Sequence, residues 1–194
     1  PVNQVNWFEA ISYCNARSRE LGLDTVYEYQ DVELNSQGHI QSLDGVKINL
    51  DVEGFRLPLE AEWEYVTRFN QSDDLESMAW YVENSGSVIH KVGDKIPGVL
   101  GFYDLQGNVM EWINDWKGSY QDLDVDNFAG AIGPNTLEER IVKGGSYQHG
   151  LNFLHPSNRG DIYPINTEIA GDYIGFRCAL GPIDNPSYLS ETGI

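Results

Sequence analysis

The distribution of aromatic residues beyond residue 70 constrains the fold most. Tryptophans, tyrosines and phenylalanines occur there singly or in pairs among glycines, asparagines and acids: Trp80, Tyr81, Trp112, Trp116, Tyr147 and Phe176. Glycines this frequent interrupt long helices, and no internal repeat is present. Twenty glycines and eight prolines in 194 residues agree with a chain rich in turns. We therefore expect one α+β domain spanning residues 1–194, with short antiparallel strands and long loops around an aromatic core.

Two segments show the spacing of amphipathic helices. Between Trp7 and Leu21 the apolar residues recur mostly every three or four positions, and Gly22 is a natural stop. Residues 59–66 follow Pro58 and carry acids in the first turn, which suits a helix start. The alternating patterns within residues 25–29 and 38–50 predict short strands.

The charge balance narrows the range of partners. Thirty acidic and twelve basic residues give a formal net charge of −18. Such a surface repels phosphate backbones and anionic membranes, so nucleic acid is not an expected partner. No apolar stretch is long enough for a transmembrane segment.

Four ordered segments carry a resemblance to a known family. They are Pro1-Val2 with Val5–Asn15, Phe55–Tyr65, Gly101–Trp112 with Asp115-Trp116, and Lys143–Tyr147 closed by Gly175–Cys178. Together they resemble the sulfatase-modifying-factor domain of formylglycine-generating enzyme. The resemblance implies a C-type-lectin-like fold with two helices. It covers the larger, C-terminal part of that domain, and the family's first portion would precede Pro1.

The chain differs from the family at the positions that carry the family's copper chemistry. In formylglycine-generating enzymes two cysteines after the Gly-Gly-Ser segment bind copper, whereas ungapped alignment puts His149 and Leu154 there. Soft thiolates select copper(I) and leucine ligates nothing, so copper is not expected. Met110 and Tyr173 replace a family tryptophan and asparagine, which predicts an altered ligand groove. The groove candidates are Met110, Ser146, Tyr147, His149 and Tyr173.

The resemblance implies a calcium site at Asp104, Gly107, Val109 and Glu111. Two carboxylates flanking a Gly-Asn turn, with carbonyls from the bent backbone, give the oxygen ligands that a hard cation prefers. An acidic surface turn is the alternative, and the aromatic context favours calcium. For a second calcium site, Asn84 is a weak candidate.

The family joins the positions of Cys14 and Cys178 in a disulfide. That bond would close nearly the whole chain and stabilise it by about 4 to 5 kcal/mol in the loop-entropy model. Two buried free thiols are the alternative. The disulfide is favoured, and with it export to the periplasm, the cell surface or the medium.

The residues suggest two other chemistries, a replacement metal site and a serine nucleophile. His149 and His155, near Asp161, contain imidazoles that suit a replacement metal site, but hydrogen-bonding roles are favoured because no spacing fixes a geometry. Ser146 lacks a base or an oxyanion signature, so a structural role in a glycine turn is favoured over nucleophilic catalysis.

The expected function follows from the lost cysteine pair. We expect a non-catalytic, calcium-stabilised binding or assembly module of an exported protein, with a protein or glycan ligand in the altered groove. A partner chain that supplies the family's first portion is a further possibility. The alternative is a divergent formylglycine-generating oxidoreductase acting on a protein or peptide.

Overall fold

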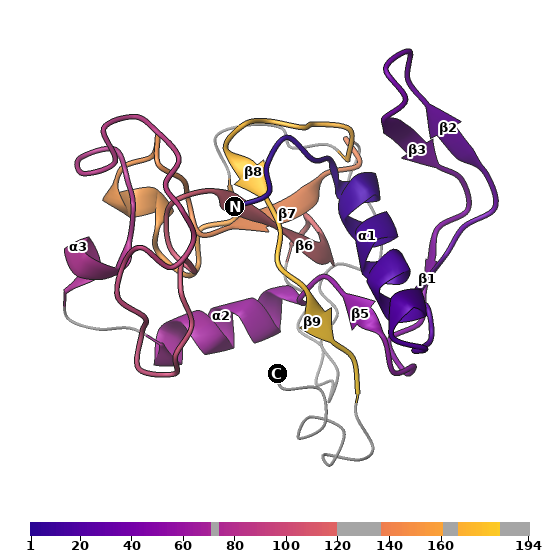
Figure 1. Cartoon of the computed structure of the whole chain (residues 1–194), viewed down its shortest axis with the longest axis horizontal. Coiled ribbons are helices and arrows are strands. Elements are labelled where there is room, and N and C mark those ends of the chain that lie inside the picture. Colours follow the sequence, from indigo (N-terminus) through magenta and orange to yellow (C-terminus); the bar gives the residue numbers. More distant parts are fainter. Residues whose placement is uncertain (71–73, 120–136, 161–166, 183–194) are drawn as a thin grey trace.

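The structure is a computed structural model that describes residues 1–70, 74–119, 137–160 and 167–182. Short elements alternate with long loops, as the glycine content predicts (Figure 1). The helices are α1 (Trp7–Glu20), α2 (Glu60–Phe69), α3 (Leu75–Met78) and the 3-10 turn η1 (Leu151–Phe153). The strands are β1 (Tyr27–Glu28), β2 (Val32–Leu34), β3 (Ile40–Leu43), β4 (Lys47–Ile48), β5 (Phe55–Arg56), β6 (Met110–Trp116), β7 (Arg140–Lys143), β8 (Ile174–Gly175) and β9 (Ala179–Leu180).

Helix α1 forms where the periodicity predicts it. A capping box fixes its start, because the Glu9 amide donates to Asn6 Oδ1 at 2.9 Å and the Asn6 amide donates to Glu9 Oε2 at 3.1 Å. Its buried face includes Trp7, Ile11 and Cys14. The helix ends at Glu20, one residue before the predicted limit.

Helix α2 begins two residues after Pro58, with Leu59 as its N-cap. Its Glu62 carboxylate accepts a hydrogen bond from the Leu59 amide at 2.8 Å. The predicted acidic first turn is present, but one of its acids, Glu60, is only 1% exposed. This acid therefore has a role in the interior as well as at the helix terminus.

A three-stranded sheet of order β7-β6-β8 lies at the centre of the molecule, between α1 and α2 in Figure 1. Strand β7 is antiparallel to β6, as expected, whereas β8 is parallel to it. The remaining strands form two-stranded pairs, β1–β4, β2–β3 and β5–β9. The β2–β3 hairpin projects from the body in Figure 1.

The aromatic core predicted from the sequence is present. Trp7 and Trp112 are both fully buried in the cluster between α1 and the sheet. Their indole N–H groups donate to the carbonyls of Ile113 and Val5 at 3.0 and 2.9 Å. These bonds satisfy the polar end of each ring, so the tryptophans fix the N-terminal segment against β6.

Within the described residues, none of the helices has the length and apolar character needed to cross a bilayer.

Candidate functional site

The segment before β6 folds into a sharp turn at the predicted calcium residues. Asp104, Gly107 and Asn108 all have positive φ values, 52°, 81° and 59°. A Cβ atom on Gly107 would lie 2.2 Å from the carbonyl oxygen of Trp80, so this position requires glycine. The Asn108 side chain holds the turn, because its amide exchanges hydrogen bonds with the His90 backbone at 3.1 Å in both directions.

The two carboxylate oxygens of Asp104 differ in their hydrogen bonding. Its Oδ2 accepts a hydrogen bond from the Gly93 amide at 2.8 Å. Its Oδ1 is buried and has no hydrogen-bond partner. An unpaired buried carboxylate oxygen is costly, so this atom fits a cation ligand.

The Glu111 carboxylate forms an ion pair with the guanidinium of Arg177. The guanidinium of Arg177 donates from Nη2 to Glu111 Oε1 at 2.5 Å and from Nε to Oε2 at 2.6 Å, and Trp63 Nε1 donates to Oε2 at 2.9 Å. Arg177 Nη2 also contacts the carbonyl oxygens of Tyr103 and Asp104, at 3.1 and 3.2 Å. The guanidinium thus joins the two ends of the predicted calcium segment.

These residues fit calcium in part. Asp104, Val109, Glu111 and Arg177 line one pocket of about 420 Å³. The spare Asp104 oxygen suits a hard cation, whereas Glu111 would have to share its carboxylate with a guanidinium. Asn84, the weak candidate for a second site, instead accepts from the Tyr81 amide at 2.9 Å and donates to the Ala79 carbonyl at 3.0 Å.

The ligand-groove candidates lie together, but most are buried. Met110, Ser146, Tyr147 and His149 are 9% exposed or less. The Met110 amide donates to the Tyr173 carbonyl at 2.8 Å, and the rings of His149 and Tyr173 meet edge to face at 6.2 Å. Only the edge of this cluster faces solvent, where Gln148 donates to the Tyr147 hydroxyl.

The histidines are held by local hydrogen bonds. The Ser146 amide donates to His149 Nδ1 at 3.1 Å, which leaves this nitrogen unprotonated, and Ser146 Oγ lies 2.7 Å from it. Burial lowers the pKa of His149. His155 Nδ1 instead contacts Ser157 Oγ at 2.7 Å, and Asp161 lies outside the described residues. In the described ranges, no three His, Cys, Asp or Glu side chains gather closely enough to hold a metal ion.

Ser146 is fully buried, which keeps its hydroxyl away from a substrate that approaches from solvent. Its Oγ accepts a hydrogen bond from the Gln148 amide at 3.3 Å. These contacts fit the structural role that the sequence favours.

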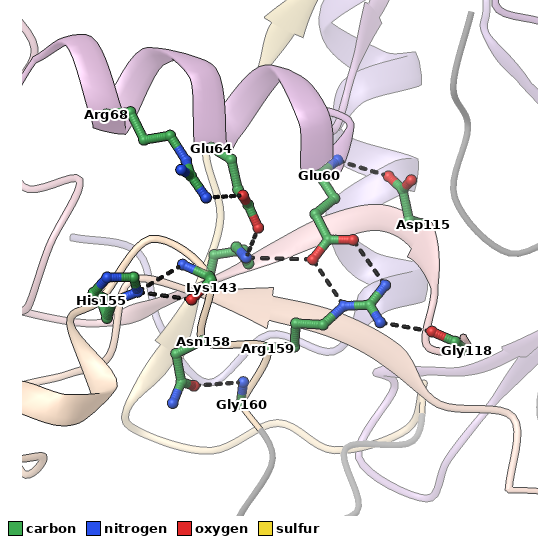
Figure 2. Close-up of polar contacts among 11 residues, drawn as sticks. Glu60, Glu64, Arg68, Asp115, Gly118, Lys143, His155, Asn158, Arg159 and Gly160 are labelled. Atoms are coloured by element: carbon green, nitrogen blue, oxygen red, sulfur yellow. Dashed lines mark hydrogen bonds and ion pairs between the residues drawn. The ribbon is translucent and has the colours of Figure 1, made fainter. Parts of the chain in front are cut away.

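A buried charge network, absent from the sequence predictions, connects α2 to the sheet (Figure 2). Glu60 receives two hydrogen bonds from the Arg159 guanidinium, each 2.8 Å, and lies 3.3 Å from Lys143 Nζ. Lys143 also donates to Glu64 at 2.8 Å and is 1% exposed. Burial opposes the ionisation of Glu64, but Lys143 lowers the pKa of this carboxyl overall. The sequence offered no signal for this network, because Glu60 is 83 residues from Lys143 and 99 residues from Arg159.

Asp115 borders the network, where its Oδ2 accepts from the Glu60 amide at 2.9 Å (Figure 2). Burial raises the pKa of Asp115 from 3.8 to about 6. A folded-state pKa above the unfolded value favours folding while the acid is protonated, so this contribution is lost as pH rises from about 4 to 6. Asp115→Asn should therefore gain stability relative to the wild type across that window, by about 1.4 kcal/mol for each pH unit between the two pKa values.

The measurement is urea denaturation of both proteins at several pH values. Asp51→Asn, at an exposed turn, is the control and should follow the wild type. Parallel curves for the Asp115 variant and the wild type would contradict the raised pKa.

The two cysteines are adjacent in space. Cys14 on α1 and Cys178 before β9 have their sulfur atoms 3.7 Å apart, and both are free thiols in this structure. A disulfide bond of about 2.05 Å needs only a local approach of the two sulfurs. The pairing implied by the family resemblance is thus compatible with the fold.

Comparison with known proteins identifies the scaffold. Residues 1–181 match the model of the sulfatase-modifying factor enzyme 1-like domain. The "Chaperone protein LppX" of Paenibacillus barcinonensis is 31% identical over 192 residues, covering 82% of this chain and 63% of that protein. The formylglycine-generating enzyme of Mus musculus is 27% identical over 147 residues, covering 65% and 39%. The chain therefore spans less than two thirds of these relatives.

Solved structures show the same fold. The Treponema denticola variable protein 1 superposes with a TM-score of 0.74 at 29% identity, covering 94% of this chain and 71% of that one. The α+β, C-type-lectin-like fold expected from the four segments is confirmed. The chain belongs to the family of sulfatase-modifying factor enzyme 1-like domains.

Proposed function

We propose that this chain is a non-catalytic binding module, a pseudoenzyme on the formylglycine-generating-enzyme scaffold. The observation that carries this proposal is the packing at the two positions aligned with the copper-binding cysteines. Leu154 is fully buried, and His149 is 9% exposed with its Nδ1 engaged by Ser146. An aliphatic side chain and one engaged imidazole do not fit the thiolate pair that copper(I) requires.

A protein is the ligand class we favour, in an exported setting. The relative named as a chaperone supports a protein ligand for this chain. The edge of the groove cluster offers polar groups for such contacts, since Gln148 and Asp172 are exposed and both hydrogen-bond the Tyr147 hydroxyl. Polar side chains around a buried aromatic ring are a common arrangement in protein interfaces.

The test of the proposal is an oxidation assay. With copper and oxygen, the chain should leave the cysteine of a sulfatase-type peptide unchanged, as followed by peptide mass spectrometry. The mouse formylglycine-generating enzyme is the positive control. Aldehyde formation above a no-protein control would overturn the non-catalytic assignment and favour a divergent oxidoreductase.

A matched variant examines the same two positions. His149→Cys combined with Leu154→Cys restores a thiolate pair, and we expect it to bind copper(I) in competition with a chromogenic chelator. Both proteins carry Cys14→Ser and Cys178→Ser, because that thiol pair would itself bind copper(I), and the protein without the added cysteines should not compete. Equal copper binding by both proteins would show that other residues supply the ligands.

We further propose that calcium stabilises the module. Asp104 Oδ1, the carbonyls of Gly107 and Val109, and a shared Glu111 carboxylate would hold the ion. Calcium would supply the positive charge that the buried Asp104 oxygen lacks. Extracellular modules bind calcium with dissociation constants of about 0.1 to 1 mM.

Calcium at about a hundredfold above its dissociation constant should stabilise the folded chain by about 2.7 kcal/mol, because it binds the folded state. Chelation should lower the melting temperature accordingly, as measured by differential scanning calorimetry. Asp104→Ala should remove the calcium response, whereas Asp51→Ala, at an exposed turn, should retain it. A melting curve that ignores calcium, chelator and Asp104→Ala alike would make Asp104 an ordinary turn residue.

A further inference from the structure

An apolar groove of about 640 Å³ lies between α2 and β9, and it shares Trp63 and Arg177 with the Glu111 cluster described above. Ala61, Tyr65 and Val66 form its α2 wall, and Phe102 and Leu105 contribute from the loop before β6. Its volume is within the range of sites that hold small ligands or a side chain of a partner. The described residues therefore form an open site that the sequence did not reveal.

The opposite wall of this groove contains a thiol. Cys178 lines the groove and is half-buried, whereas Cys14 lies behind it and is fully buried. Their sulfur atoms are 3.7 Å apart. Pairing of Ala179 with Arg56 holds Cys178 beside α1, so the two thiols stay together.

We propose that Cys178 and Cys14 form an exchangeable dithiol that reacts with an apolar or aromatic disulfide held in the groove. The Cys178 thiolate attacks one substrate sulfur, forms a mixed disulfide and releases the other half as a thiolate. Cys14 then loses its proton and attacks Cys178 Sγ, which forms the Cys14–Cys178 disulfide and releases the second half. The substrate disulfide is thereby reduced by two electrons to two thiols, and the protein dithiol is oxidised.

The environment of each thiol indicates which one attacks the substrate and which one resolves the mixed disulfide. The hydrogen bond from Cys14 lowers the pKa of Cys178 overall, although burial acts against it, and the Arg17 guanidinium adds to the lowering. The same hydrogen bond and burial raise the pKa of Cys14. An accessible thiol with thiolate character attacks first, while a buried neighbour resolves the mixed disulfide. This role is independent of calcium and of the proposed ligand of the module.

The test uses the full chain, first reduced with a phosphine, and 2,2′-dithiodipyridine as the aromatic disulfide. The wild type should release two equivalents of pyridinethione, and its intact mass should fall by two hydrogens. Cys14→Ser should release one equivalent and retain a pyridylthio adduct, mapped to Cys178 by peptide mass spectrometry. Cys178→Ser should release none while folded and one after denaturation.

Other outcomes overturn the proposal. A folded Cys14→Ser chain without an adduct would show that Cys178 is not the entry point. Rapid release by folded Cys178→Ser would assign the attack to Cys14. Near-ultraviolet circular dichroism of each variant confirms that the comparison concerns folded protein.

A second variant tests the groove itself. Ala61→Trp places a ring in the groove from an exposed helix position. It should slow the reaction with 2,2′-dithiodipyridine about tenfold, the equivalent of losing a small apolar contact, and change the rate with the polar hydroxyethyl disulfide little. Equal rates for wild type and variant, or equal slowing with both reagents, would show that the groove does not select the disulfide.

Discussion

Glu60→Ala is expected to lower the free energy of unfolding by about 3 to 5 kcal/mol. Glu60 is 1% exposed and is the anion shared by Lys143 and Arg159 (Figure 2). Its removal takes two hydrogen bonds from Arg159 and one ion-pair contact from the fully buried Lys143 ammonium. Breaking a buried ion network costs more than the network contributes over apolar residues, because the two cations lose much of the negative charge that balances them.

Urea denaturation of the variant and the wild type measures this loss. Glu20→Ala is the matched control, since Glu20 pairs with Arg17 at the surface and should contribute less than about 1 kcal/mol. Lys143→Met should cost less than Glu60→Ala, because the apolar chain refills the space and Glu60 retains Arg159. A loss for Glu60→Ala no greater than that of the surface control would contradict the role of the network.

Arg177→Met in the presence of chelator is expected to lower the free energy of unfolding by about 3 to 5 kcal/mol. Glu111 is 5% exposed, and without the guanidinium its charge is balanced by a single indole N–H from Trp63. Methionine retains much of the apolar stem of arginine, so the lost stability comes mainly from the missing positive charge. Arg68→Met removes an exposed guanidinium and should lose less than about 1 kcal/mol, because its partner Glu64 keeps the ion pair with Lys143.

Calcium should recover part of the stability lost in Arg177→Met. Once the guanidinium is removed, Glu111 is free to join Asp104 in binding a cation, and repulsion between two cations disappears. The midpoint of a calcium titration, followed by melting temperature, should therefore move to a lower concentration than in the wild type. If the variant is as insensitive to calcium as Asp104→Ala, then Glu111 is not a calcium ligand and Arg177 is its permanent partner.

The sequence by itself determined the helix and the turn that depend only on interactions between nearby residues. The three- and four-residue spacing from Trp7 to Cys14 places one apolar face on a helix, and Asn6 with Glu9 caps it. The turn at Gly107 follows from a glycine that must tolerate positive φ beside the Trp80 carbonyl. The α+β class followed from these local patterns, whereas the C-type-lectin-like fold was predicted by the resemblance of four ordered segments to a known family.

Tertiary structure alone decided which distant side chains share charge and space. Glu60 and Arg159 are 99 residues apart, and Glu111 and Arg177 are 66 residues apart, so no spacing rule connects them. The predicted groove residues proved mostly buried, while the open groove at Cys178 arises where α2 packs beside β9. The sequence specifies the charged groups, whereas their burial and pairing depend on how the helices and strands pack. That packing determines which carboxylates remain able to bind a cation.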